Sequence, residues 1–273
     1  YSDRRYEGGM GNSGGFDGLY RFNNNLKLDF QLFSSKTVEP NDTTISLSLN
    51  GHLFGKDSIT SDFDGDIFSG HSLYFSLEGW KKNRALTLLY AERSPTFRVD
   101  NGYIDFNDRR QLVLTTGTML YPNNNTFETL SFWFGTGRVF SFDWTQLTDW
   151  IYLSHSGQMK GQLGYGITLF AEDEFYKNIL FEDNYGLEIS FEKSFSKSIS
   201  FDIKPKFGTE IIRVDAPYQA RNTGLGFGIE LKPSDEFKLN FRMDQSKSIR
   251  FENDEVVYSD MIARARFEYQ ATT

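Results

Sequence analysis

Apolar and polar residues alternate along most of the chain, and segment 185–208 shows the pattern most clearly. Successive side chains of a β-strand point to opposite faces, so this alternation predicts a hairpin with one apolar and one polar face. The polar stretch 194–198 separates its two strands. The apolar face of this hairpin consists of Leu187, Ile189, Phe191, Phe201 and Ile203.

The same period of two recurs from residue 26 to residue 269 and predicts about thirteen strands, many with the length of about nine to eleven residues that a membrane span needs. Short polar turns alternate with longer polar segments, which is typical of outer-membrane barrels. Region 127–160 is consistent with one very long and one shorter strand, or with four short strands. The longer segments are expected at 37–70, 93–108, 172–184, 212–222 and 247–259.

The pattern predicts an all-β fold, a transmembrane antiparallel up-and-down β-barrel. Residues 1–273 are expected to form a single barrel domain that is incomplete at both ends, with about sixteen strands in the complete protein. The alternative is a soluble sandwich or propeller, whose sheets bury one face. Charges along the polar face and aromatic residues near strand ends favour the barrel. Beyond the first hairpin, the side chains expected to face lipid are Leu225, Phe227, Ile229, Leu239 and Phe241.

Composition narrows the class of protein further. Aromatic residues make up 16% of the 273 residues, yet the mean hydropathy is −0.48. No run of about 18 apolar residues exists, so transmembrane helices are not expected. The chain has no cysteine, which excludes disulfides and thiolate chemistry. Its net charge of −8 argues against a nucleic-acid partner.

Segment 90–110, "YAERSPTFRVDNGYIDFNDRR", carries a more specific motif. It resembles the largely uncharacterised outer-membrane β-barrel domain that lies C-terminal to family-9-type carbohydrate-binding modules in Bacteroidota proteins. The family's Ser-Pro-x-Phe-Arg-x-Asp-x-Gly-aromatic run reads here as Ser94, Pro95, Phe97, Arg98, Asp100, Gly102 and Tyr103. Asp108 is also kept, whereas Phe106 stands where the family often has a basic residue. The resemblance implies a carbohydrate-binding-like module before Tyr1, a link to glycans and no established catalytic residues.

The motif is expected to leave the barrel wall and to pack on the lumen side as a plug. Pro95 lacks a backbone donor, and Phe97 would be unfavourable in an open aqueous loop. Arg98 is expected to be held by carboxylates, because its fork of donors suits a structural clamp. Recognition of a ligand is the alternative. The predicted plug residues are Arg93, Ser94, Pro95, Phe97, Arg98, Asp100, Gly102 and Asp108.

Candidate chemistry elsewhere is sparse. Asp62, Asp64 and Asp66 alternate around a glycine, which is half of a calcium-loop pattern; a solvated acidic turn is the alternative. The histidines lack the spacing of zinc ligands. His155 lies between Ser154 and Ser156, but adjacent strand residues point to opposite faces and cannot pair directly. Apart from calcium, no cofactor is expected.

The sequence therefore predicts a non-enzymatic protein of a Gram-negative outer membrane. Its expected function is a membrane platform in a surface complex, and the resemblance links this complex to glycans. A channel for small solutes or glycans is the alternative, and an outer-membrane lipase is a remote one. The expected partners are outer-membrane lipid and other outer-membrane or surface proteins, with no nucleic acid.

Overall fold

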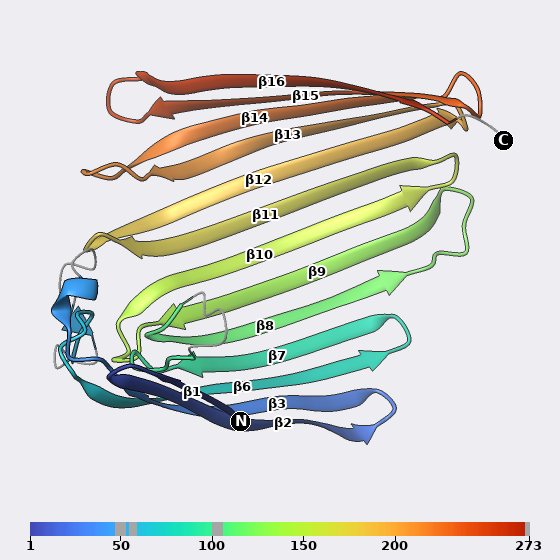
Figure 1. Cartoon of the computed structure of the whole chain (residues 1–273). Coiled ribbons are helices and arrows are strands. Elements are labelled where there is room, and N and C mark those ends of the chain that lie inside the picture. Colours follow the sequence, from blue (N-terminus) through green and yellow to red (C-terminus); the bar gives the residue numbers. More distant parts are fainter. Residues whose placement is uncertain (47–52, 55–58, 100–105, 271–273) are drawn as a thin grey trace. The chain divides into compact units, whose positions relative to one another are not determined.

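A computed structural model describes residues 1–46, 53–54, 59–99 and 106–270 of the chain. Fourteen strands form one sheet, in which each strand lies beside the strand that follows it in this sheet (Figure 1). The first six are β1 (Ser2–Tyr6), β2 (Gly9–Asn23), β3 (Leu26–Val38), β6 (Ile67–Lys81), β7 (Arg84–Arg93) and β8 (Arg109–Leu120). The next four are β9 (Phe127–Phe140), β10 (Gln146–Met159), β11 (Leu163–Tyr176) and β12 (Ile179–Ser196). The last four are β13 (Ile199–Ile212), β14 (Tyr218–Leu231), β15 (Phe237–Arg250) and β16 (Val256–Tyr269).

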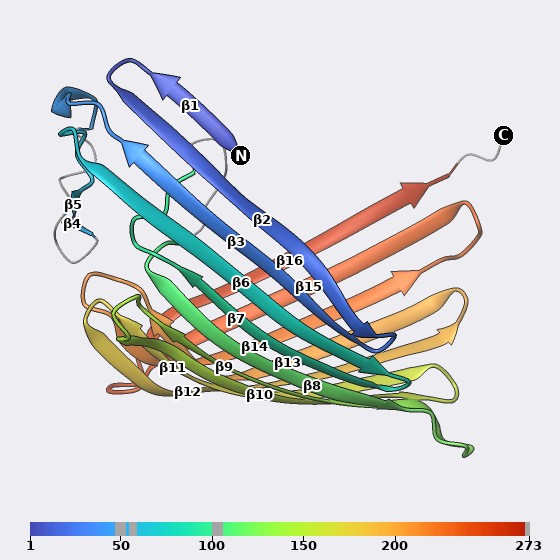
Figure 2. The ribbon, with the colours of Figure 1, turned by 90° about the horizontal axis from the view of Figure 1, so that it is seen from below.

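The all-β, antiparallel, up-and-down prediction is confirmed. The sheet has 14 strands rather than about thirteen, and β1 and β16 stand at the two ends of the order of described strands. A separate two-stranded ribbon pairs β4 (Leu53–Phe54) with β5 (Ile59–Thr60). This ribbon and the short 3-10 helix η1 (Thr43–Ile45) lie beyond the ends of β3 and β6 (Figure 2). The side chain of Asp42 caps η1 by accepting a hydrogen bond from the backbone of Thr44.

Three of the expected longer loops are wrong in extent. Instead of a loop at 172–184, β11 and β12 meet at a tight turn formed by Lys177 and Asn178, both with positive φ. The charged residues that suggested a loop there belong to the ends of β11 and β12, which continue up to this turn. In the same way, the segments expected at 212–222 and 247–259 shrink to 213–217 and 251–255. Polar residues at strand ends, which stay in the hydrogen-bonded ladder, caused these errors.

Region 127–160 contains neither one very long strand nor four short ones. It forms two strands of 14 residues each, β9 and β10, joined by residues 141–145. Ser141 and Asp143 account for this connection: Thr145 donates its backbone N–H to both side chains, at 3.1 and 3.2 Å. The turn lies within an aromatic-rich stretch, so periodicity alone did not reveal it.

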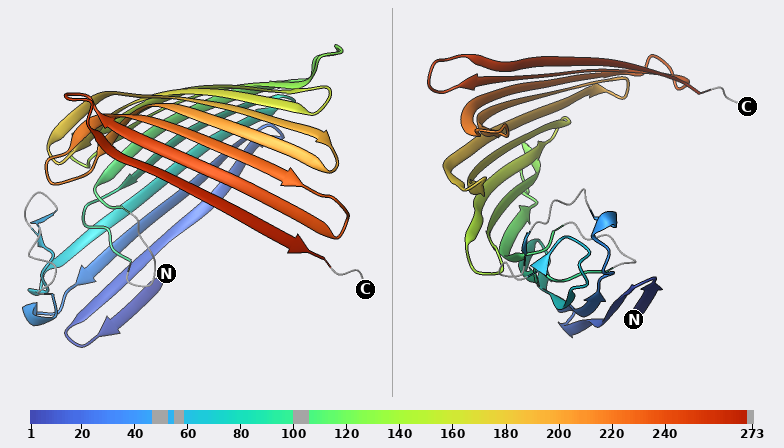
Figure 3. Two further views of the ribbon diagram at one scale, coloured as in Figure 1. Left: turned by 90° about the horizontal axis from the view of Figure 1, so that it is seen from above. Right: turned by 60° about the vertical axis from the view of Figure 1, so that its left-hand side comes forward.

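Residue contacts divide the chain into two compact units. Unit 1 comprises Tyr1–Thr115 with Gly137–Thr148, and unit 2 comprises Thr116–Thr136 with Asp149–Thr273. In unit 1, strands β2, β3, β6 and β7 pair in register, and two longer connections, 39–66 and 94–108, leave the sheet. In unit 2, hairpins follow one another with short connections only, as the strands from β11 to β16 show (Figure 3).

The apolar positions predicted for unit 2 share one face of its sheet. Cross-strand registers join Phe191 to Ile203, Ile203 to Phe227, and Ile229 to both Phe201 and Phe241. No described element of unit 2 packs over this face, and Phe191 and Phe241 keep 43% and 38% of their surface exposed. Unit 2 therefore presents an uncovered apolar face.

The described part of the chain contains no helix with the length and apolar character needed to span a membrane.

Candidate functional site

The segment Ser94–Val99 follows β7 and folds back onto β3 and β6 of unit 1. Ser94 donates its backbone N–H to the carbonyl of His71 at 2.9 Å, and the N–H of His71 donates to the Ser94 hydroxyl at 2.9 Å. Thr96 donates its hydroxyl to the carbonyl of Ser69 at 2.6 Å. These bonds fix the backbone path of this fold-back segment from its first residues onward.

Phe97 is the apolar anchor of the fold-back segment, with only 5% of its surface exposed. Its backbone lies directly over Gly70, where a Cβ would overlap the N and Cα atoms of Phe97. Glycine at position 70 is therefore needed for the close approach. On the other side, Asn107 donates its amide to the carbonyl of Phe97 at 2.6 Å and holds the far end of the connection.

Arg98 binds the carboxylate of Glu39 at the end of β3. Its Nη1 lies 2.7 Å from Oε1 of Glu39, and its backbone N–H donates to the Ser35 hydroxyl at 3.1 Å. The guanidinium also lies 5.6 Å from the centre of the Phe63 ring. The second oxygen of Glu39 is buried and accepts no hydrogen bond from the described residues. Arg98 thus clamps the fold-back segment to the sheet.

The carboxyl group of Glu39 has an unusual pKa because the residue is almost fully buried. Burial raises the pKa of Glu39 from 4.5 to about 7, since an ionised carboxylate loses its hydration there. Arg98 opposes this effect, whereas Asp64 and Asp66 reinforce it by repulsion. The clamp therefore joins a permanent cation to a carboxyl group that changes charge near neutral pH.

Stability should depend on pH through Glu39. The folded state keeps the proton up to about pH 7, whereas the unfolded chain releases it near pH 4.5, so folding is favoured at low pH. We expect this contribution to be lost as pH rises from 4.5 to 7. Thermal unfolding of wild type and Glu39→Gln across this range measures it, because glutamine cannot titrate. A stability difference that does not change with pH would contradict the expectation.

The remaining predicted plug residues do not all join the clamp. The side chain of Arg93 donates to the carbonyl of Phe106 at 2.6 Å. Pro95 offers its carbonyl to Asn107 at 3.4 Å. Asp108 accepts a hydrogen bond from the backbone of Phe142 at 2.9 Å, away from Arg98. Asp100 and Gly102 lie outside the described residues.

Sequence reasoning missed a second polar cluster in unit 1, centred on Glu92. One carboxylate oxygen accepts from the Tyr90 hydroxyl at 2.6 Å and from Arg110 Nε at 3.0 Å, and the other lies 3.1 Å from His71 Nε2. Arg110 stacks on the ring of Phe142, at 3.9 Å from its centre. Tyr90 and Glu92 share one face of β7 with Leu88, and their register partners on β6 are Phe75 and Leu73. Neither the alternation nor this pairing indicates the cluster.

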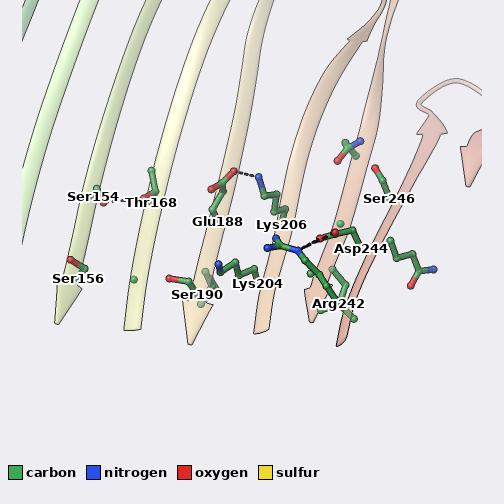
Figure 4. A pocket seen from close by; sticks show the side chains of 17 residues that line it. Ser154, Ser156, Thr168, Glu188, Ser190, Lys204, Lys206, Arg242, Asp244 and Ser246 are labelled. Carbon is green, nitrogen blue, oxygen red and sulfur yellow. Dashed lines mark hydrogen bonds and ion pairs between the residues drawn. The ribbon is translucent and has the colours of Figure 1, made fainter. Parts of the chain in front are cut away.

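The polar face of unit 2 carries paired charges (Figure 4) beside the glycines of β14. Lys206 lies 2.5 Å from Glu188, and Arg242 lies 3.1 Å from Asp244. Gly226 of β14 pairs in register with Lys204 on one side and with Asp244 on the other. Because the glycines leave room, the long side chains of β13 and β15 can lean over β14.

These residues line an open polar cavity of about 540 Å³ within unit 2. Ser154, Ser156 and Thr168 lie on β10 and β11 at one side of it. The charged side chains lie on β12, β13 and β15, together with Ser190 and Ser246 (Figure 4). Ser154 and Thr168 are joined across β10 and β11 at 2.9 Å. The lining is polar, so it suits water and polar solutes. Each carboxylate named above already has a cationic neighbour.

The aspartates of the predicted calcium loop lie beside the clamp, because the backbone N–H of Glu39 donates to the carbonyl of Asp66 at 3.0 Å. Asp64 accepts from the Thr60 hydroxyl at 2.9 Å, Asp66 from the Thr60 backbone at 3.4 Å, and the carbonyl of Asp62 accepts from the backbone of Asp64. The described residues include no group of three or more histidines, cysteines or acidic residues arranged to hold a metal ion, and calcium binding stays a prediction.

Both ring nitrogens of His155 are engaged. Nδ1 lies 2.9 Å from the carbonyl of Ser131, and Nε2 lies 2.8 Å from the hydroxyl of Tyr165. Ser156, one of its sequence neighbours, shares a hydrogen bond with Ser131 instead, at 2.6 Å. His155 therefore joins three strands in this arrangement.

The fold and its two sites define a class of protein. It is an all-β chain with an antiparallel up-and-down sheet, whose polar face carries the Arg98–Glu39 clamp in unit 1 and an open polar cavity in unit 2. Comparison with protein-family models, with curated proteins and with solved structures finds no match.

Proposed function

We propose that this chain forms part of the wall of a transmembrane β-barrel in the outer membrane of a Gram-negative bacterium, where it serves as a membrane platform for a surface complex. The observation that carries the proposal is the two-faced sheet of unit 2. Its apolar face is uncovered, and its opposite face carries charges. A soluble sheet would bury the apolar face against a second layer, whereas lipid would cover it in a membrane.

Strand length supports the same proposal. Strands β9, β10, β11, β13, β14, β15 and β16 each have 14 residues, which exceeds the roughly nine to eleven that a tilted membrane strand needs. The surplus residues would extend each strand beyond the hydrocarbon core into the headgroup region.

The platform role is favoured by the fold-back segment of unit 1. The clamp at Arg98 and the anchor at Phe97 hold this segment against the polar face of β3 and β6. Ordered chain on the lumen side of a barrel reduces the open cross-section. Other outer-membrane or surface proteins are the partners that such a platform would bind.

A channel for small polar solutes is the second candidate. The open, hydroxyl-rich cavity on the polar face of unit 2 favours it. Conductance in planar bilayers distinguishes the two roles: a platform passes little current, whereas a channel passes a steady current through single openings.

The membrane topology can be tested with nitroxide scanning, since the chain has no native cysteine. Single cysteines along Asp202–Phe207 are spin-labelled in the protein reconstituted in lipid vesicles. We expect labels at 203 and 207 to meet oxygen dissolved in lipid, and labels at 202, 204 and 206 to meet a water-soluble nickel complex. The contrast should alternate with a period of two.

Uniform access of the nickel complex to all positions would show that lipid does not cover the apolar face, and the membrane proposal would fail. Residues 244 and 245 of β15 provide a matched pair on another strand, because Asp244 and Gln245 are register partners of Gly226 and Leu225. Residue 244 should follow the aqueous pattern and residue 245 the lipid pattern.

A further inference from the structure

A second cavity lies on the polar face of unit 1, apart from the clamp at Arg98. Its volume is about 260 Å³, and strands β3, β6, β7 and β8 form its floor. In register, Gln31 pairs with Tyr74, Tyr74 with Ala91, and Ser72 with Arg93. Six residues of its lining have large polar or aromatic side chains: Gln31, Tyr74, Arg93, Phe106, Arg109 and Gln111.

The unpaired charge that borders this cavity is positive. Arg93 and Arg109 both line it. Glu92 also contributes to the lining, but its carboxylate is bound by Tyr90, Arg110 and His71 in the separate cluster described above. Two guanidinium groups therefore border the cavity, and among the described residues no other carboxylate lines it.

The polar groups of this cavity are also unsatisfied, in contrast to the paired charges of unit 2. Among the described residues, the side chains of Gln31, Tyr74 and Gln111 form no hydrogen bond, and that of Arg109 has no acceptor. The Nε of Arg93 is buried and has no acceptor either. A buried donor without a partner is unfavourable, so a ligand or water must meet Arg93 Nε.

The sixth side chain, Phe106, supplies an apolar surface at the rim. It is 60% exposed, its carbonyl is fixed by Arg93 at 2.6 Å, and the Arg109 guanidinium lies 4.5 Å from the centre of its ring. The position of the ring is thus set by the same two arginines that border the cavity.

We propose that this cavity binds a small hydroxylated carboxylate, of which a uronate sugar is the simplest example. Guanidinium groups suit a carboxylate because their donors match its two oxygens. The amides of Gln31 and Gln111 and the phenol of Tyr74 can donate to and accept from hydroxyl groups. A volume of about 260 Å³ lies below the roughly 300–1,000 Å³ of sites for drug-sized ligands, which limits the ligand to about one ring. This inference does not depend on the membrane proposal.

Titration calorimetry on the full chain in detergent micelles tests it, with galacturonate as the probe. Galactose offers the same ring without the carboxylate, and acetate offers the carboxylate without the hydroxyl groups. We expect galacturonate to bind at least tenfold more tightly than either. Equal affinity for galactose would overturn the role of the arginines, equal affinity for acetate would overturn the role of the amides, and absence of galacturonate binding would overturn the proposal as a whole.

Variants locate the site. Arg109→Gln should weaken galacturonate binding at least tenfold, and Gln31→Ala should weaken it by a smaller factor. The matched control is Arg213→Gln, another arginine-to-glutamine change, at a residue of unit 2 that is already paired with Glu174. It should leave the affinity unchanged. Equal loss in Arg109→Gln and Arg213→Gln would assign binding to general charge and overturn the site.

Discussion

Ile189→Arg should destabilise the membrane-inserted protein by roughly 2–4 kcal/mol, the cost of an arginine near the midplane on the lipid side of a barrel. Ile189 lies well inside β12 and pairs with Ile167 on the apolar face. A guanidinium there would replace an aliphatic side chain by a charge that lipid cannot hydrate. The free energy of unfolding is measured by urea titration of the protein in lipid vesicles.

Ser190→Arg is the matched control, because Ser190 is the next residue of β12 and lies on the opposite, polar face. The same arginine should change the free energy of unfolding by much less there, since the cavity of unit 2 is open to water. Similar losses for both variants, or a larger loss for Ser190→Arg, would show that the apolar face does not meet lipid.

Gly70→Ala should displace the fold-back segment from the sheet. The added methyl group would overlap the backbone of Phe97, and backbone atoms cannot rotate away as a side chain can. Overpacking of this kind typically costs about 1–3 kcal/mol. We expect faster trypsin cleavage after Arg98, because the variant loses the seat that protects this bond.

Gly79→Ala, on the same strand, serves as the control. A methyl group at position 79 would meet Leu26 at 3.6 Å, an ordinary contact, so cleavage after Arg98 should proceed at the wild-type rate. If Gly70→Ala also leaves this rate unchanged, Phe97 is not the anchor of the segment.

The period of two was sufficient to predict the fold class and most hairpins, because alternation follows directly from strand geometry. This period failed to place strand ends in which polar residues stay in the hydrogen-bonded sheet. Glu172 and Asp173 suggested a loop, yet they continue β11 up to a turn whose signal is the single asparagine at 178. Strand ends beyond the apolar band have no hydrophobic pattern that would place their boundaries.

The candidate site was only partly accessible from sequence. The types of residues in the motif indicated a clamp at Arg98, but its acceptor Glu39 lies 59 positions away, and nothing local marks it. Ser69 lies 27 positions before its partner Thr96, and neither it nor Gly70 carries a local signal, although both contact the segment. Contacts of this range depend on which strands become neighbours, and a single sequence does not record that.

The nearest-neighbour order of the sheet has a consequence for folding. In unit 2, each strand from β11 to β16 pairs with the strand that follows it, so the contacts between strands are local in sequence. A low contact order favours rapid folding for a β-protein, with hairpins added one after another. The bond between Arg98 and Glu39 closes a much larger loop. We expect it to form late, after β3, β6 and β7 have paired, so the fold-back segment would report the completion of unit 1.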